Sequence, residues 1–108
     1  MNQAFALAVA VAALSLTPAT ASAKPAAHTA TIVVDKLAFG AAPSNLRVGD
    51  TVVWANRDLF RHSATATGHF DVDLPPGANR RMVLRRAGVF PFMCKFHPGM
   101  KGVLKVGR

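Results

Sequence analysis

The apolar positions after residue 30 fall in short runs, rich in β-branched and aromatic residues and separated by turn residues. Such runs are typical of strands, and no segment keeps a helical period over about ten residues. Met82 and Leu84 alternate with exposed-type residues, as in a strand that is buried on one face. The pattern predicts strands at 31–34, 45–48, 51–55, 63–67, 81–85, 89–93 and 102–106. We therefore expect an all-β, antiparallel β-sandwich of about seven or eight strands.

The first residues follow a different pattern. Residues 4–16 are almost wholly apolar, and the next seven, Thr-Pro-Ala-Thr-Ala-Ser-Ala, end in small residues typical of a signal-peptide cleavage site. We predict a signal peptide over 1–23, cleaved after Ala23, although its first three residues carry no lysine or arginine. The apolar run is too short to span a bilayer, so no membrane anchor is expected. The prediction is an exported protein, periplasmic in a bacterium, with one domain over 24–108.

The chain is strongly basic. It has 13 Lys and Arg against 5 acidic residues, a formal net charge of +8, and all of these charges lie after position 23. Such a charge steers acidic partners toward the protein and makes the association sensitive to salt. Nucleic acid is the alternative partner, but the basic residues come singly or in pairs, such as Arg80-Arg81 and Arg85-Arg86. With export, this spacing argues against nucleic-acid binding.

The chain has a single cysteine, so it cannot form an intramolecular disulfide. Cys94 begins a short loop between two predicted strands, and His97 and Met100 follow it at intervals of three residues. Pro98-Gly99 disfavours a helix in this loop, so we expect a tight turn in which the side chains converge. Met93, the neighbour of Cys94, points to the other side of the sheet and is expected in the core. With His62, four donors are available, and a thiolate, two imidazoles and a thioether suit a copper electron-transfer site.

These residues resemble the motif of the cupredoxins, the type 1 blue copper proteins that include amicyanin, plastocyanin and pseudoazurin. The resemblance covers about 32 to 106: a Val-Val-Trp-Ala-Asn-Arg-Asp segment at 52–58, then His62, then Cys94-x-x-His97-x-x-Met100 before a final strand. It implies a Greek-key sandwich with copper at one end. It also implies that His62, Cys94 and His97 are the close ligands and Met100 the long axial one. Ser63 stands where the family often has asparagine to tie the ligand loops together, and its hydroxyl can do part of this.

Other interpretations stay open. Zinc accepts thiolate and imidazole, but thioether is a poor zinc ligand. A copper protein could also store or deliver the metal without redox cycling, and the same sandwich could serve as a metal-free interaction domain. Four protein donors leave no position open for substrate, so we expect a carrier rather than an enzyme. His28 and His69 are expected not to be ligands, and Trp54 to be a core residue.

The resemblance implies that the imidazole of His97 reaches the surface, where redox partners dock transiently. Candidates for an apolar patch around it are Phe60, Phe96, Pro98 and Gly99. Candidates for a basic rim that steers acidic redox proteins are Arg57, Arg61, Lys95 and Lys101. A monomer is expected for such a diffusing carrier.

Overall fold

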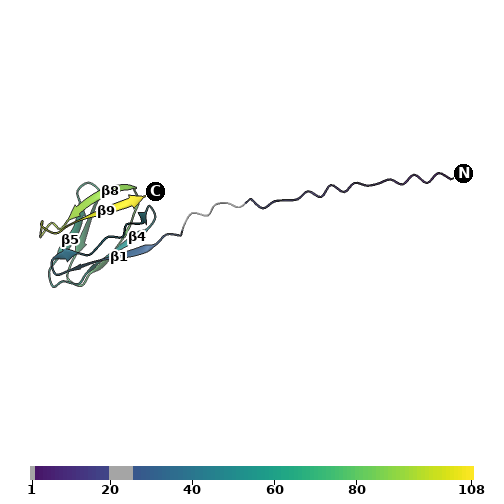
Figure 1. Ribbon diagram of the computed structural model, residues 1–108. Helices are drawn as coiled ribbons and strands as arrows, with labels where there is room; N and C mark the ends of the chain where they lie inside the picture. The colour runs from purple at the N-terminus through teal and green to yellow at the C-terminus, as the bar shows by residue number, and fades with distance from the viewer. Residues whose placement is uncertain (1, 20–25) are drawn as a thin grey trace.

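The computed structural model describes residues 2–19 and 26–108 and contains nine strands in two facing sheets (Figure 1). One sheet has the order β2-β1-β4-β7 and the other the order β3-β9-β8-β5-β6. The strands are β1 (Thr29–Asp35), β2 (Ala38–Phe39), β3 (Leu46–Arg47), β4 (Thr51–Asn56), β5 (His62–Ala66), β6 (Phe70–Leu74), β7 (Asn79–Val83), β8 (Gly88–Met93) and β9 (Lys101–Gly107). The all-β Greek-key sandwich is confirmed.

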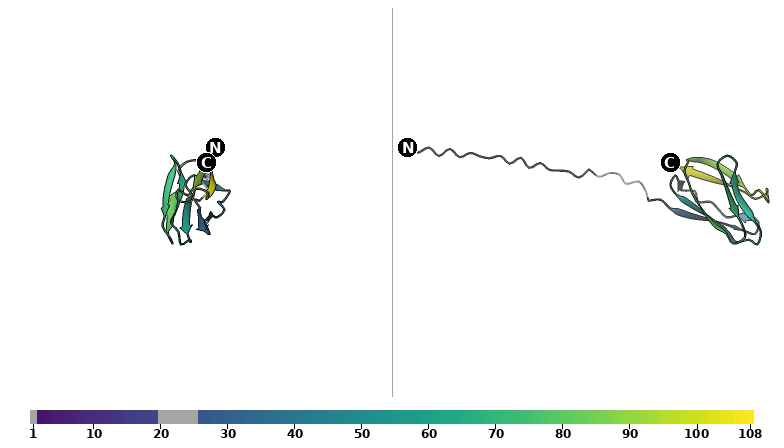
Figure 2. Two further views of the ribbon diagram at one scale, coloured as in Figure 1. Left: turned by 90° about the vertical axis from the view of Figure 1, so that its left-hand side faces the viewer. Right: turned by 180° about the vertical axis from the view of Figure 1, so that it is seen from behind.

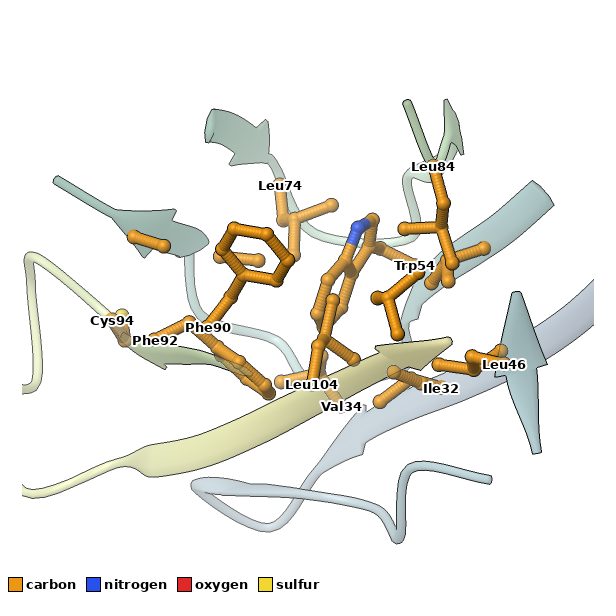
Figure 3. Packing of buried hydrophobic residues seen from close by; sticks show 14 of the residues in the cluster. Ile32, Val34, Leu46, Trp54, Leu74, Leu84, Phe90, Phe92, Cys94 and Leu104 are labelled. Carbon is orange, nitrogen blue, oxygen red and sulfur yellow. The ribbon is translucent and has the colours of Figure 1, made fainter. Parts of the chain in front are cut away.

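The core lies between the sheets and is built around Trp54, which is fully buried in the middle of β4. Figure 3 shows Trp54 at the centre of this core, with Cys94 at one end and Leu46 at the other. The ring of Phe92 meets Trp54 edge-on at 5.1 Å and Phe39 at 4.8 Å between centroids. Gly102 lies under this ring, since a Cβ atom there would come within 2.3 Å of Phe92 Cζ. Aromatic packing therefore fixes the end of β8, directly before Cys94.

All seven predicted strands are present, with ends that differ by up to two residues. Two strands were missed. The short β2 has two residues only, whereas β6 carries a clear alternation in which Phe70, Val72 and Leu74 face the interior. Two aspartates on its outer face lower its strand propensity, which explains why composition did not reveal it.

The expected antiparallel pairing holds for five of the seven strand pairs, and the other two pairs are parallel, so the sheets are mixed. β1 pairs in parallel with β4, and β3 in parallel with β9. The reason is topological. After β1, the chain returns through β2 and then through β3 in the other sheet, so β4 re-enters the first sheet in the direction of β1.

The N-terminal segment takes no part in this sandwich where the structure describes it. Residues 2–19 form no helix or strand, and their large apolar side chains are exposed. The predicted cleavage point after Ala23 lies outside the described residues. Within the described residues, no helix has the length and hydropathy needed to cross a membrane.

Different turns and connections lie at the two ends of the sandwich. The C-terminus and the start of β1 share one end, and the loop that follows β8 projects from the other (Figures 1 and 2). That opposite end also receives the β1–β2 turn and the β4–β5 connection. The predicted ligands therefore come from connections that lie at a single end of the sandwich.

Candidate metal centre

Three of the predicted ligands meet at this end. His62 begins β5, Cys94 directly follows β8, and His97 lies three residues further on. Cys94 Sγ lies 3.6 Å from Nδ1 of His62 and 3.9 Å from Nδ1 of His97. All three candidate ligand atoms lie within 4.8 Å of one another. Since metal–nitrogen and metal–sulfur bonds are about 2.0–2.3 Å long, this spacing fits donors that share one metal ion.

The ligand loop, residues 94–100, is the predicted tight turn rather than a helix. The N–H of Met100 donates to the carbonyl of His97 at 2.8 Å, and the N–H of Cys94 donates to the carbonyl of Met100 at 3.1 Å. These bonds close the loop on itself. The side chain of Met100 is buried in the same hydrophobic cluster as Cys94, so a thioether lies on the interior side of the loop.

Met93 was wrongly expected in the core. The alternation on which that expectation rested is present, because Phe90, Phe92 and Cys94 all face the interior. Met93 therefore points to the outer face, where it is half-buried and pairs in register with Thr65. As expected, it points away from the cysteine and from the candidate centre.

His62 is held in one orientation by a carboxylate that the sequence reasoning did not single out. His62 is fully buried, and its Nε2–H donates to Asp58 Oδ2 at 2.7 Å, which leaves Nδ1 free to face Cys94. Asp58 also accepts the backbone N–H groups of Lys36 and Leu37 at 2.7 and 2.9 Å. The bond from Leu37 N–H, followed by those from His62 and Lys36, outweighs desolvation and holds the pKa of Asp58 at about 2. Its position four residues before His62 is the sequence feature that could have pointed to it.

Asn56 anchors the connection that carries Asp58. It is buried, and its Nδ2 group donates to the carbonyls of Phe60 and Leu74, both at 2.8 Å. Its Oδ1 accepts the N–H of Asp58 at 2.9 Å. One amide thus fixes both ends of the segment that places His62 at the site.

The thiol of Cys94 lies in surroundings that favour its thiolate. Burial raises its pKa, but the hydrogen bond from the Ser63 N–H, at 3.4 Å, and the contacts with both imidazoles outweigh burial and lower the pKa to about 6. Ser63 also accepts the N–H of Lys95 through its hydroxyl at 2.9 Å. The hydroxyl therefore does connect the two ligand segments, as its place in the sequence predicts.

The surface above the site is apolar in part, as expected. His97 is half-buried, and its ring lies 6.2 Å from that of Phe60. Phe60 and Phe96 are exposed, and Leu59, which the sequence reasoning left out, is 90% exposed. Such an apolar surface beside a half-buried candidate ligand suits contact with another protein.

The basic rim is partly neutralised by nearby carboxylates. Arg61 forms two hydrogen bonds to Asp73, at 2.9 and 3.1 Å, and its guanidinium lies over the ring of Phe96 at 4.9 Å. Lys95 pairs with Asp71 at 2.8 Å. Arg57 and Lys101, by contrast, have no ion pair among the described residues. Two of the four rim cations therefore offer little unpaired charge to a partner.

The remaining histidines lie elsewhere. His69 is exposed in the β5–β6 turn, with its ring 5.0 Å from that of Phe90, and His28 is exposed just before β1. Neither joins the cluster of His62, Cys94 and His97. Both therefore lie away from the candidate centre, as expected of residues that are not ligands.

The donor set itself indicates the metals that the site suits. Two nitrogen donors and a thiolate face one another, and no carboxylate belongs to the cluster. Soft sulfur with imidazole favours copper or zinc over magnesium or calcium, which prefer oxygen. The centre is also largely closed, because His62 and Cys94 are fully buried and only His97 is partly exposed.

Comparison with known proteins identifies the fold. No protein-family model matches the chain, and no curated protein matches it. Among solved structures, the chain is similar to the reduced Cu(I) form of an amicyanin variant, with 24% identity and a TM-score of 0.62 over 72% of this chain and 81% of that one. It is similar to amicyanin from Paracoccus versutus, with 20% identity and a TM-score of 0.62 over 79% and 85% of the two chains. The resemblance to the cupredoxins is thus confirmed for the fold.

Proposed function

We propose that His62, Cys94, His97 and Met100 hold one copper ion and that the protein carries single electrons between redox partners. The observation that supports this most directly is the meeting of a buried thiol and two imidazoles within 4.8 Å. They meet at one end of a sandwich that has the fold of amicyanin. The nearby thioether of Met100 completes a donor set that suits copper better than zinc.

Copper in this site would supply a one-electron couple, because thiolate and thioether favour Cu(I) whereas imidazole nitrogen suits Cu(II). Hydrogen bonds within the chain hold the donors in place. Asp58 orients His62, Ser63 holds Cys94, and the backbone bonds of the ligand loop position His97. Donors that keep their positions need little rearrangement when the charge changes, which favours fast electron transfer. His97, beside the exposed Phe60, is the group through which an electron would leave.

A copper titration tests this proposal. Adding Cu(II) to the purified metal-free protein should produce an intense visible absorption band from the thiolate, and reduction should abolish it. Cys94→Ser should lose the band, whereas His69→Ala, which changes an exposed histidine outside the cluster, should keep it. A colourless Cu(I) complex without a coloured Cu(II) form would instead support storage or delivery. Failure to bind either ion would contradict the proposal.

We further propose that the chain is exported to the periplasm after removal of residues 1–23 and acts there as a monomer. The supporting observations are the apolar run at 4–16 and a sandwich whose first strand, within the described residues, begins at Thr29. Intact mass of the protein recovered from the periplasm of a bacterial host should correspond to residues 24–108. An uncleaved chain that stays in the cytoplasm would contradict this part.

Acidic redox proteins are the proposed partners, docking transiently over His97. Leu59, Phe60 and Phe96 supply the exposed apolar contact. Because Arg61 and Lys95 are already paired with aspartates, we assign local steering to Arg57 and Lys101, together with the net charge of +8.

A further inference from the structure

Four residues beside the candidate centre, Ser63, Thr65, Asp71 and Lys95, form a closed ring of hydrogen bonds. The N–H of Lys95 donates to Ser63 Oγ at 2.9 Å, and this oxygen lies 2.9 Å from Thr65 Oγ1. The hydroxyl of Thr65 donates to Asp71 Oδ1 at 2.8 Å. The ammonium of Lys95 closes the ring by donating to Asp71 Oδ2 at 2.8 Å. Both the backbone and the side-chain end of Lys95, the residue after Cys94, are therefore held by the same network.

Asp71 determines the direction of the hydrogen bonds in this ring. An ionised carboxylate only accepts hydrogen bonds, so the Thr65 hydroxyl proton must point to Asp71. The Thr65 oxygen then accepts the proton of Ser63, and the lone pairs of Ser63 are left for the N–H of Lys95. A carboxylate on the surface thus determines which way a buried hydroxyl points.

The ring connects directly to the cysteine. Ser63 donates its backbone N–H to Cys94 Sγ at 3.4 Å and accepts the next N–H of the ligand loop through its side chain. Ser63 is fully buried and Thr65 nearly so, whereas Asp71 is about half exposed. A shift of Ser63 or Lys95 would therefore change how the sulfur faces the two imidazoles.

We propose that Asp71 is a positioning residue of the metal centre: it acts through Thr65 and Ser63 to hold Cys94 in place, while its own hydrogen bonds go to Thr65 and Lys95. This inference rests on the proposed function only in so far as the cysteine binds a metal. The ring itself consists of hydrogen bonds within the chain, so hydrogen exchange tests it separately from metal binding.

The chain offers a matched control in Asp73. It lies two residues along β6 from Asp71, with a side chain 53% exposed against 55%, and it also pairs with a cation, Arg61. In the β5–β6 register Asp71 faces Thr65 and Asp73 faces Ser63. Only Asp71, however, accepts a bond from a hydroxyl of β5. Asp71→Ala and Asp73→Ala therefore remove the same charge from the same strand, and only the first opens the ring.

The first experiment is amide hydrogen exchange of the metal-free protein, followed by NMR. In Asp71→Ala, the amide of Lys95 should exchange about fivefold faster or more, corresponding to the loss of one modest hydrogen bond. The amide of Leu104, in the core strand β9, reports global opening and serves as the internal reference. Asp73→Ala should leave the ratio of the two rates unchanged. Equal effects of the two variants on this ratio, or no effect of Asp71→Ala, would overturn the proposal.

The second experiment uses the copper-loaded protein. Asp71→Ala should shift the visible band and lower copper affinity by about three- to tenfold, less than the 10–100-fold typical of groups that contact a ligand directly. Thr65→Val, which opens the ring but keeps the Lys95–Asp71 pair, should reproduce this effect, and Asp73→Ala should not. Faster exchange at Lys95 with an unchanged band and affinity would overturn the positioning role. A wild-type protein that binds no copper would contradict the proposed function instead, and hydrogen exchange would still decide whether the ring holds the loop.

Discussion

Asp50 and Asp58 lie just before and just after β4, and each clamps one end of its parallel neighbour β1. Asp50 accepts the backbone N–H of His28, directly before β1, at 2.8 Å and that of Arg47 at 2.9 Å. Asp58 accepts the N–H groups of Lys36 and Leu37, directly after β1. Only Asp58 has a further partner, the Nε2–H of His62. At both ends of the sandwich an aspartate thus accepts backbone N–H groups beside β1, and at one end this aspartate also holds a candidate ligand.

The end that carries the candidate ligand also has a strained backbone. Lys36 and Leu37 have positive φ angles of 51° and 57°, which non-glycine residues rarely adopt. Asp58 holds both of their N–H groups, so its bonds help to offset this cost. At the end that carries the candidate centre, here called the metal end, the Asp58 carboxylate both holds the chain after β1 and orients His62. At the opposite end, here called the far end, the Asp50 carboxylate holds only backbone N–H groups.

Removing Trp54 should weaken both ends together. Trp54→Ala takes the central aromatic ring from β4, between the two aspartates, and should lower the free energy of unfolding by about 3–5 kcal/mol. Urea denaturation measures this. If the variant does not fold, Leu104→Ala should show a loss of about 2–5 kcal/mol.

Trp54→Phe is the control for this change. Trp54 Nε1 is the one buried side-chain nitrogen or oxygen without a hydrogen-bond partner in the described part of the chain. Phenylalanine removes this group and keeps an aromatic ring, so it should cost clearly less than alanine. An equal loss in both variants would show that ring packing is not what β4 contributes.

The paired variants Asp58→Asn and Asp50→Asn separate the stability that each carboxylate gives from the orientation of His62, which only Asp58 provides. Both should lower the melting temperature, because each replaces a charged carboxylate by a neutral amide and so weakens the hydrogen bonds from backbone N–H groups. Asp58→Asn should also lower copper affinity by about 10–100-fold, since it no longer orients His62 as a carboxylate does. Competition with a chelator measures the affinity. A similar loss of affinity in Asp50→Asn would refute the distinction between the ends.

Acid should weaken the hydrogen bonds that Asp50 accepts from the backbone N–H groups of His28 and Arg47. The hydrogen bonds from the N–H groups of His28 and Arg47 lower the pKa of Asp50 below its usual 3.8. A carboxyl whose pKa is lower in the folded protein stabilises it above the unfolded pKa, and this contribution is lost as the pH falls through the folded value. The metal-free protein should therefore lose stability below about pH 4, and Asp50→Asn should reduce this pH dependence. Thermal unfolding between pH 2 and 5 measures it, and identical slopes in both proteins would contradict the prediction.

The smallest effects are expected from the surface charges around the metal end. Arg61→Gln with Asp73→Asn removes a whole ion pair and keeps the net charge, so the electron-transfer rate with an acidic redox protein at low salt should not change. Arg57→Gln with Lys101→Gln removes two unpaired cations and should lower this rate, with a weaker salt dependence. Stopped-flow kinetics measure both. Steering by Arg57 and Lys101 would be refuted if the second pair of changes had no effect.

Much of the fold and the candidate site was predictable because both depend on local features. Alternation over a few residues located seven strands, and the three-residue spacing in the ligand loop, with Pro98-Gly99 inside it, indicated a turn with convergent donors. Local patterns missed β6, because two aspartates of low strand propensity alternate there with the inward-facing apolar residues. In β6, the aspartates that obscured the strand are Asp71 and Asp73, whose partners lie on β5 and in the loops at the metal end.

Local patterns in the sequence predicted seven of the nine strands, the donor types and the spacing of Cys94, His97 and Met100, because covalent geometry and side-chain alternation act over a few residues. The bond between Asp58 and His62, the path from Asp71 through Thr65 to Ser63, and the outward position of Met93 arise only when the two sheets come together. These contacts depend on strand register and on how two sheets pack. Register joins residues far apart in the chain, and no local pattern specifies which of them will meet.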